Sequence, residues 1–257
     1  QTLLSVKAID LATGDEVDIP AAECGFGYRD SAFKRELAGR FLITHVAFSL
    51  QPGGAPSIRY AELSRALAGN PAPTLADVRR TVLALRRSKS MVHDPADENH
   101  RSAGSFFTNP IVTEAVLDRA REAAEPLLRP GEKMPEFPAG SGLTKLAAGW
   151  LIERSGFTKG AGEGAVGLST RHALAIVNRG GATASEIVAF AASIKRRVRE
   201  RFGVTLMPEP VLVGFEPSET AELLAPRARC AYVARAMGQH DQFAKETFAL
   251  ETATVTR

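Results

Sequence analysis

Two polar side chains, Ser105 and Glu209, have neighbours that would hold them rigidly. Ser105 follows the small residues Ala103 and Gly104, which let another group approach the backbone, and it precedes two phenylalanines that would anchor the segment in a core. Glu209 lies between two prolines, which fix the backbone and remove the ladder hydrogen bonds of a regular strand. A fixed hydroxyl or carboxyl can transfer a proton. The alternative for Ser105 is a buried turn whose serine only satisfies a backbone group.

Three further side chains could bind or stabilise a charged ligand. Tyr28 and Arg29 are neighbours in a segment rich in glycine and aromatic residues, 24–34, and Tyr60 lies on a loop. A guanidinium binds a carboxylate through two parallel hydrogen bonds in a fixed geometry. We therefore look for one function that explains these three side chains together with Ser105 and Glu209.

Hydrophobic spacing and turn residues predict the elements that must position these side chains. Apolar residues that alternate with polar ones predict strands, and apolar residues at helical spacing predict helices. The expected strands are residues 3–9, 17–19, 41–50, 173–177, 204–206 and 211–213. The expected helices are residues 61–67, 74–89, 113–127, 144–152, 183–202, 218–224 and 231–243.

The helix expected at residues 183–202 has the clearest signals. Thr183 and Glu186 form a capping box, and Gly203 is the expected C-cap. The side chains expected to be buried are Ile187, Phe190, Ile194, Val198 and Phe202. The basic side chains expected on the other side are Lys195, Arg196, Arg197, Arg199 and Arg201. Nucleic acid is an alternative ligand for that face, but charge runs on helices are usually solvated, so we expect no nucleic-acid partner. Strands 204–206 and 211–213 would complete a β-α-β unit.

Composition limits the class of protein. The 257 residues are 44% hydrophobic, which is enough for one large or two modest domains. No apolar run approaches the roughly 20 residues of a membrane helix, and no signal segment begins the sequence, so we expect a cytoplasmic protein without a membrane partner. The net charge of +3 suits an anionic ligand. Cys24 and Cys230 fit no metal or redox spacing and are expected to be reduced thiols.

Two segments invite functional interpretations that their spacing does not favour. The polar loop 93–100 contains histidines and carboxylates, but none has a helical or strand spacing that would fix metal-ligand geometry, so we predict no metal site. The glycine-rich run 159–167 lacks the preceding strand and following helix of a nucleotide fingerprint. A loop that covers part of a ligand is the simpler interpretation.

Four segments resemble a known family. Residues 27–34, 102–110, 147–153 and 208–209 are similar, in order and spacing across about residues 1–214, to segments of UDP-N-acetylenolpyruvoylglucosamine reductases, also called UDP-N-acetylmuramate dehydrogenases. The resemblance implies a flavoenzyme of peptidoglycan precursor synthesis. In that family NADPH reduces FAD, and the reduced flavin passes a hydride to the enolpyruvyl group of a UDP-sugar.

The resemblance also implies catalytic roles for three residues. Ser105 corresponds to the proton donor, which protonates the carbon next to the carboxylate, and Arg29 and Glu209 correspond to the other two catalytic residues. Hydride addition builds negative charge on the carboxylate side, which a guanidinium stabilises in a dry site. A carboxylate beside that charge would oppose the reaction, so we expect Glu209 to act in a protonated or hydrogen-bonded form, which burial favours.

The matching positions imply binding roles as well. The expected substrate-binding residues are Tyr60, Lys89, Asn109, His172 and Arg86, and Tyr28 is the expected cofactor-binding residue. Tyr60 matches a tyrosine on a mobile loop that covers the UDP-sugar. His172 stands where some relatives carry glutamine. The alternative is that His172, as an isolated histidine before a strand, has a structural role instead of a substrate contact.

The resemblance predicts an α+β fold, in which the C-terminal part of a flavin-binding domain is followed by an α/β substrate-binding domain. We expect residues 1–98 to be the remainder of the FAD-binding domain, 99–214 the substrate-binding domain and 215–257 an unassigned extension. Most of the family's FAD-binding segments are absent from these 257 residues, so we expect an N-terminal part to be missing and this fragment alone to be inactive. The alternative is a non-catalytic UDP-sugar-binding module that has lost the flavin domain. We expect a monomer.

Overall fold

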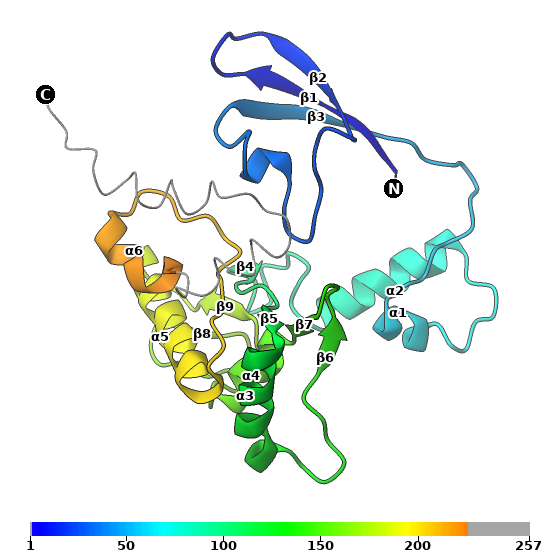
Figure 1. Ribbon diagram of the computed structural model, residues 1–257. Helices are drawn as coiled ribbons and strands as arrows, with labels where there is room; N and C mark the ends of the chain where they lie inside the picture. Colours follow the sequence, from blue (N-terminus) through cyan, green and yellow to red (C-terminus); the bar gives the residue numbers. More distant parts are fainter. Residues whose placement is uncertain (1, 226–257) are drawn as a thin grey trace, which may run out of the picture. The chain divides into compact units, whose positions relative to one another are not determined.

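The computed structural model describes residues 2–225, which form two compact units that meet in the sequence between Ser57 and Ile58 (Figure 1). This division falls inside the range 1–98 that was expected to form one domain, and the functional division at residue 98 stays a prediction. The residues combine helices with antiparallel sheets, in agreement with the expected α+β class. No described helix is long and apolar enough to cross a membrane.

The first unit is a three-stranded antiparallel sheet with the strand order β2-β1-β3. Val6 in the central strand pairs with Ile19 on one side and Val46 on the other. Val6, Ala8 and Ile19 form a small buried core with Cys24. The strands predicted at residues 3–9, 17–19 and 41–50 are confirmed. The elements are β1 (Leu3–Asp10), β2 (Glu16–Pro20), η1 (Ala32–Lys34) and β3 (Phe41–Phe48).

The second unit contains two three-stranded antiparallel sheets and six α-helices among its described residues. The sheet orders are β4-β9-β8 and β5-β7-β6. The strands are β4 (Ser102–Ser105), β5 (Ile111–Thr113), β6 (Glu136–Pro138), β7 (Leu143–Leu146), β8 (Val166–Leu168) and β9 (Ala175–Asn178). The helices are α1 (Ala61–Ala66), α2 (Leu75–Arg87), α3 (Glu114–Ala124), η2 (Glu125–Leu127), α4 (Ala148–Arg154), α5 (Ala184–Phe202) and α6 (Pro217–Leu224).

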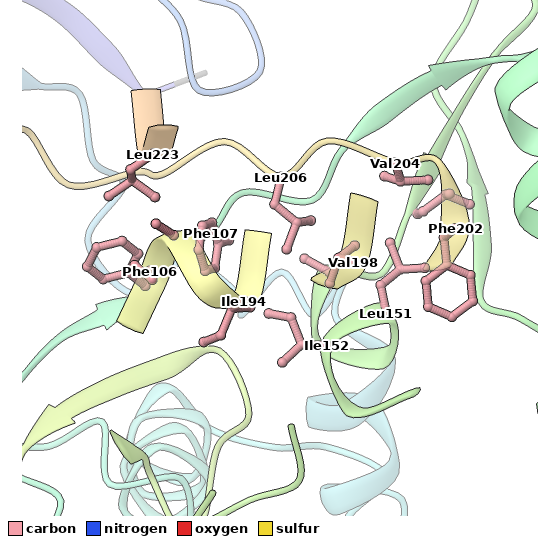
Figure 2. Close-up of a cluster of buried hydrophobic side chains, with 14 of the residues drawn as sticks. Phe106, Phe107, Leu151, Ile152, Ile194, Val198, Phe202, Val204, Leu206 and Leu223 are labelled. Carbon is pink, nitrogen blue, oxygen red and sulfur yellow. The ribbon is translucent and has the colours of Figure 1, made fainter. Parts of the chain in front are cut away.

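The core of the second unit lies along α5 (Figure 2). Ile194 and Val198 of this helix are fully buried and belong to one cluster with Leu151 and Ile152 of α4. Phe107, which follows β4, is 2% exposed and belongs to the same cluster. The segment that carries Ser105 is therefore anchored in the largest core of the molecule, as its two phenylalanines predicted.

Helix α5 confirms its predicted ends. The Thr183 hydroxyl accepts a hydrogen bond from the Glu186 N–H at 3.2 Å, and the Glu186 carboxylate accepts one from the Thr183 N–H at 2.7 Å. Gly203 ends the helix at a φ of 66°, a left-handed conformation that glycine adopts without a Cβ clash.

Lys195 was wrongly placed on the solvated basic face of α5. It is 2% exposed, and its ammonium donates hydrogen bonds to the carbonyls of Leu223 at 2.6 Å and Ala225 at 2.8 Å. These carbonyls lie at the C-terminal end of α6, where the helix dipole favours a positive charge. Lys195 therefore attaches α6 to α5.

Two other element predictions were wrong, and so was the alternative of a turn at Ser105. Residues 144–146 form part of β7 rather than the start of a helix, which begins at Ala148. Residues 102–105 form a strand rather than a turn. Residues 204–206 and 211–213 are not strands, so the predicted β-α-β unit does not form. Pro208 and Pro210 lack the N–H donors that a strand would need here, and Val211 and Val213 are more than 80% exposed.

Only the start of the predicted extension 215–257 is described, and it forms α6 as expected. The helix predicted at 231–243 and Cys230 lie outside the described residues.

The buried position of Lys195 can be tested by its effect on stability. Substitution Lys195→Met should lower the free energy of unfolding by about 1–3 kcal/mol, because the carbonyl of the buried Leu223 and the carbonyl of Ala225 lose their donor. Arg196 is the matched control, since its guanidinium is half exposed and pairs with Glu222 at 2.7 Å. Arg196→Met should cost less than about 1 kcal/mol. Urea unfolding of both variants measures the difference, and equal losses would contradict the buried role.

Candidate functional site

The end of β4 fixes Ser105 against β9. Ser105 pairs with Ala175, and the next N–H, of Phe106, donates to the Leu174 carbonyl at 2.7 Å. Gly104 has a φ of 79°, and a Cβ built there would have no atom within 4 Å. The backbone beside Ser105 is therefore held on one side and open to a ligand at the preceding glycine.

The segment that carries Glu209 pairs with residues 106–108, which follow β4. The Glu209 N–H donates to the Phe106 carbonyl at 2.8 Å, and the Thr108 N–H donates to the Met207 carbonyl at 3.0 Å. Phe107 and Pro208 form an isolated antiparallel bridge between them. The structure thus brings the backbone of Glu209 against the residue next to Ser105, although the two are remote in sequence.

His172 is the hydrogen-bond partner of Ser105. The Ser105 Oγ lies 3.4 Å from His172 Nε2, and both residues are partly buried. His172 lies in the turn between β8 and β9, where its N–H donates to Ser169 Oγ at 3.3 Å and its carbonyl accepts from the Ala175 N–H at 3.1 Å. The turn that carries His172 therefore ends at the residue that pairs with Ser105.

Two lysines and one glutamate affect the charge of the His172 imidazole. Burial lowers the pKa of His172, and the nearby ammonium groups of Lys89 and Lys159 lower it further, whereas Glu62 opposes them. Lys89 itself forms an ion pair with Glu62 of α1. His172 is consequently neutral at pH 7. Lys89, expected as a substrate-binding residue, is thus part of the surroundings of Ser105.

Three other predicted substrate residues have structural contacts. Asn109 Oδ1 accepts from the Ala148 N–H at 2.9 Å and so caps the start of α4. The Arg86 guanidinium donates to the Met91 carbonyl at 3.2 Å and closes the turn after α2. Tyr60 precedes α1 and is 79% exposed. Their roles in substrate binding stay predictions.

Tyr28 and Arg29 lie in the first unit, and Ser105 lies in the second. Tyr28 is 46% exposed, and Arg29 has a φ of 57°. A positive φ is unusual for a residue with a side chain and is enriched at functional sites. The Arg29 carbonyl accepts from Lys34 Nζ at 3.2 Å, a contact that helps to fix this turn.

The glycine-rich run 159–167 binds an arginine of the same chain. The Arg179 guanidinium donates to the carbonyls of Gly160 at 2.7 Å and Gly162 at 2.9 Å. A Cβ at Gly167 would lie 2.2 Å from the same guanidinium, so that position requires glycine. The run therefore does not form a phosphate cradle, because its carbonyls face a cation. Among the residues that the structure describes, no cluster of three or more histidine, cysteine or acidic side chains could hold a metal ion.

Sequence reasoning missed Lys159, Glu62 and Arg179. Lys159 and Glu62 affect the charge of His172, and Arg179 holds the loop that begins at Lys159. The glycines of that loop were a signal of close backbone approach, but nothing in their spacing identified an arginine as the group that approaches.

The lowered pKa of His172 predicts how stability depends on pH. As pH falls through the ordinary histidine value of about 6.5, the unfolded chain binds a proton before the folded chain does, so folding loses stability. A His172→Gln variant should lose less stability between pH 7 and pH 5 than the wild type. Urea unfolding at the two pH values measures this, and an unchanged loss would contradict the neutral state of the buried ring.

Comparisons with known proteins find similarity to one kind of enzyme. Residues 94–213 match the family model for the UDP-N-acetylenolpyruvoylglucosamine reductase C-terminal domain. The UDP-N-acetylenolpyruvoylglucosamine reductase of Thermobifida fusca (strain YX) is 47% identical over 218 residues, which cover 83% of this chain and 60% of the relative. That of Mycobacterium tuberculosis (strain ATCC 25618 / H37Rv) is 46% identical over 222 residues, with coverages of 83% and 59%.

A crystal structure of UDP-N-acetylenolpyruvylglucosamine reductase from Thermus caldophilus aligns with 81% of this chain and 52% of its own, at 22% identity and a TM-score of 0.43. The chain spans about 60% of the length of the curated relatives it matches. The match of residues 94–213 and the identity over 218 residues, which include Ser105, His172 and Glu209, place the chain in the UDP-N-acetylenolpyruvoylglucosamine reductase family.

Proposed function

We propose that the protein carrying this chain reduces UDP-N-acetylenolpyruvoylglucosamine to UDP-N-acetylmuramate in peptidoglycan precursor synthesis. The observation that carries this proposal is the fixed hydroxyl of Ser105, which is held between β9 and the segment of Glu209. The names of relatives that are 46–47% identical support the same substrate. FAD, reduced by NADPH, would supply the hydride to the enolpyruvyl double bond.

Ser105 acts in this proposal as the proton donor to the carbon next to the carboxylate. Hydride addition to the neighbouring carbon leaves a strongly basic carbanion, which even a weakly acidic hydroxyl can protonate if it is already in place. The two-sided backbone pairing around Phe106 supplies that fixed geometry. Arg29 would stabilise the negative charge that develops on the carboxylate.

Glu209 acts in this proposal in a protonated or hydrogen-bonded form. An ionised carboxylate would repel the negative charge that builds on the substrate, whereas a carboxylic acid can donate a hydrogen bond to it. Its backbone N–H is fixed to the Phe106 carbonyl, which supports a position beside the reacting group.

The cationic side chains would bind the diphosphate of the UDP-sugar. Lys89 lies close enough to His172 to lower the pKa of its ring, which places an ammonium group beside the proposed proton donor. Arg86 and Tyr60 would contact other parts of the nucleotide sugar. Asn109 already uses its Oδ1 at the start of α4, so its amide NH₂ is the group left for the substrate.

Two described positions are candidates for a flavin contact. A Cβ at Gly104 would have no atom within 4 Å, so the backbone beside Ser105 is open to a ligand, and the half-exposed Tyr28 of the first unit stays the expected cofactor-binding residue. The glycine-rich loop does not fit a phosphate, because its carbonyls bind Arg179. We therefore assign no described residue to the flavin phosphates.

The second candidate function is a UDP-sugar-binding module without redox activity. The favouring observation is that the carbonyls of Gly160 and Gly162 bind Arg179, so the glycine-rich loop does not present a phosphate site. The visible absorption spectrum of the purified protein separates the two functions. Bound flavin that NADPH reduces supports the reductase, and a colourless protein that still binds the UDP-sugar supports the module.

The role of Ser105 is tested by separating the two halves of the reaction. In a Ser105→Ala variant of the flavin-loaded protein, NADPH should still reduce the flavin, because the hydroxyl has no part in that step. Reoxidation by the enolpyruvyl substrate should slow by about 100-fold or more, since the proton donor is lost. Stopped-flow absorbance measures both rates, and normal reoxidation would refute the assignment. Ser102→Ala on the same strand is the matched control.

The protonated form of Glu209 has its own test. A Glu209→Gln variant keeps a hydrogen-bond donor but cannot release a proton, so its steady-state rate should depend less on pH at the alkaline side than the wild-type rate does. The pH profile of kcat between pH 6 and 9 measures this. Full activity with an unchanged profile would exclude a proton role for Glu209.

A further inference from the structure

A serine hydroxyl has one hydrogen, so a serine that protonates a substrate must keep that hydrogen directed at the substrate. The hydrogen bond between Ser105 Oγ and His172 Nε2 can form in two ways. If the serine donates to the ring, its hydrogen points away from the substrate. If the ring donates to the serine, the hydrogen remains available. In a neutral ring, the tautomer of His172 decides between these arrangements.

The surroundings of His172 select a neutral ring. Lys89 after α2 and Lys159 at the start of the glycine-rich loop both disfavour the imidazolium, and burial acts in the same direction. Glu62 acts against them but is paired with Lys89. The neighbouring Arg171 is directed elsewhere, since its guanidinium donates to the Arg87 carbonyl at 3.4 Å.

The position of Lys159 is built into the fold. The Gly160 N–H donates to the Ser169 carbonyl at 3.1 Å, and the hydroxyl of the same Ser169 accepts from the His172 N–H. Arg179 holds the Gly160 carbonyl at 2.7 Å. The loop that carries Lys159 and the turn that carries His172 thus share Ser169 as an anchor.

A neutral ring has one N–H, and its position determines what Ser105 can do. Among the described residues, His172 Nε2 is the side-chain atom within hydrogen-bond distance of Ser105 Oγ. When the serine gives up its proton, its oxygen becomes an alkoxide that needs a donor, and an N–H that is already in place lowers the cost of that charge.

We propose that His172 is a positioning residue that donates its Nε2–H to Ser105 Oγ and so keeps the serine hydrogen directed at the substrate. This inference rests on the proposed function. The O–H bond of Ser105 breaks as the C–H bond forms at the carbon next to the carboxylate, and the electron pair of the new bond comes from the reduced double bond. The serine oxygen keeps its electron pair as an alkoxide and afterwards takes a proton from water. His172 stays neutral throughout.

The tautomer is tested on the chain without flavin. In ¹⁵N NMR spectra at pH 7, the His172 ring should show a protonated Nε2 and an unprotonated Nδ1, and it should titrate below the ordinary value of about 6.5. His172→Gln assigns the signals by their loss. Ser105→Ala should shift the Nε2 resonance more than the Nδ1 resonance. A ring protonated on Nδ1, or charged at pH 7, would overturn the inference.

The kinetic test compares two replacements of the same ring in the flavin-loaded protein. His172→Gln retains an N–H donor, whereas His172→Leu removes it. Reoxidation by the enolpyruvyl substrate should be about tenfold to 100-fold slower in the leucine variant than in the glutamine variant, and reduction by NADPH should be equal in both. The glutamine variant should keep the wild-type pH profile between pH 6 and 8.

The outcomes distinguish the inference from the proposed function. If the wild-type protein is neither reduced by NADPH nor reoxidised by the substrate, the proposed function fails, and the NMR result still decides the tautomer. If the wild type works but glutamine is as slow as leucine, His172 supplies a proton rather than a hydrogen bond, and the inference fails while the function stands.

Discussion

The candidate site depends on two backbone hydrogen bonds that Phe106 makes to different segments. Its N–H donates to the Leu174 carbonyl at 2.7 Å, and its carbonyl accepts from the Glu209 N–H at 2.8 Å. Its side chain is 4% exposed in the core of the second unit. One residue therefore fixes the end of β4, the approach to β9 and the segment of Glu209. The backbone of Ser105 owes its fixed position to these contacts, and its hydroxyl is hydrogen-bonded to His172 Nε2.

Sequence reasoning identified the rigid positions but not the strands around them. The caps of α5 were predictable because Thr183, Glu186 and Gly203 act locally. The segment after α5 was predicted as strands because it is apolar, yet Val204 and Leu206 are buried without a ladder, and the prolines beyond them remove donors. Short apolar segments specify burial more reliably than they specify hydrogen-bond pattern.

The charge distribution was predicted least well. Lys195 belonged by spacing to a solvated face, and only tertiary structure places the end of α6 against it. The influence of Lys159 and Glu62 on His172 likewise depends on segments far apart in sequence. Spacing along a helix orients a side chain on that helix but does not reveal which element packs beside it.

The two prolines beside Glu209 also make the pairing intolerant of length changes. Of residues 208–210, only Glu209 has an N–H, so a slip of one residue in either direction would present a proline to the Phe106 carbonyl and leave that carbonyl without its donor. An insertion of one residue between the end of α5 and Pro208 would therefore have to be absorbed before the bridge, by bulging out residues 203–206. Val204 and Leu206 are buried there, at 1% and 0% exposed, and resist such a bulge. The number of residues between the end of α5 and Glu209 is therefore constrained, as is the identity of Glu209 itself.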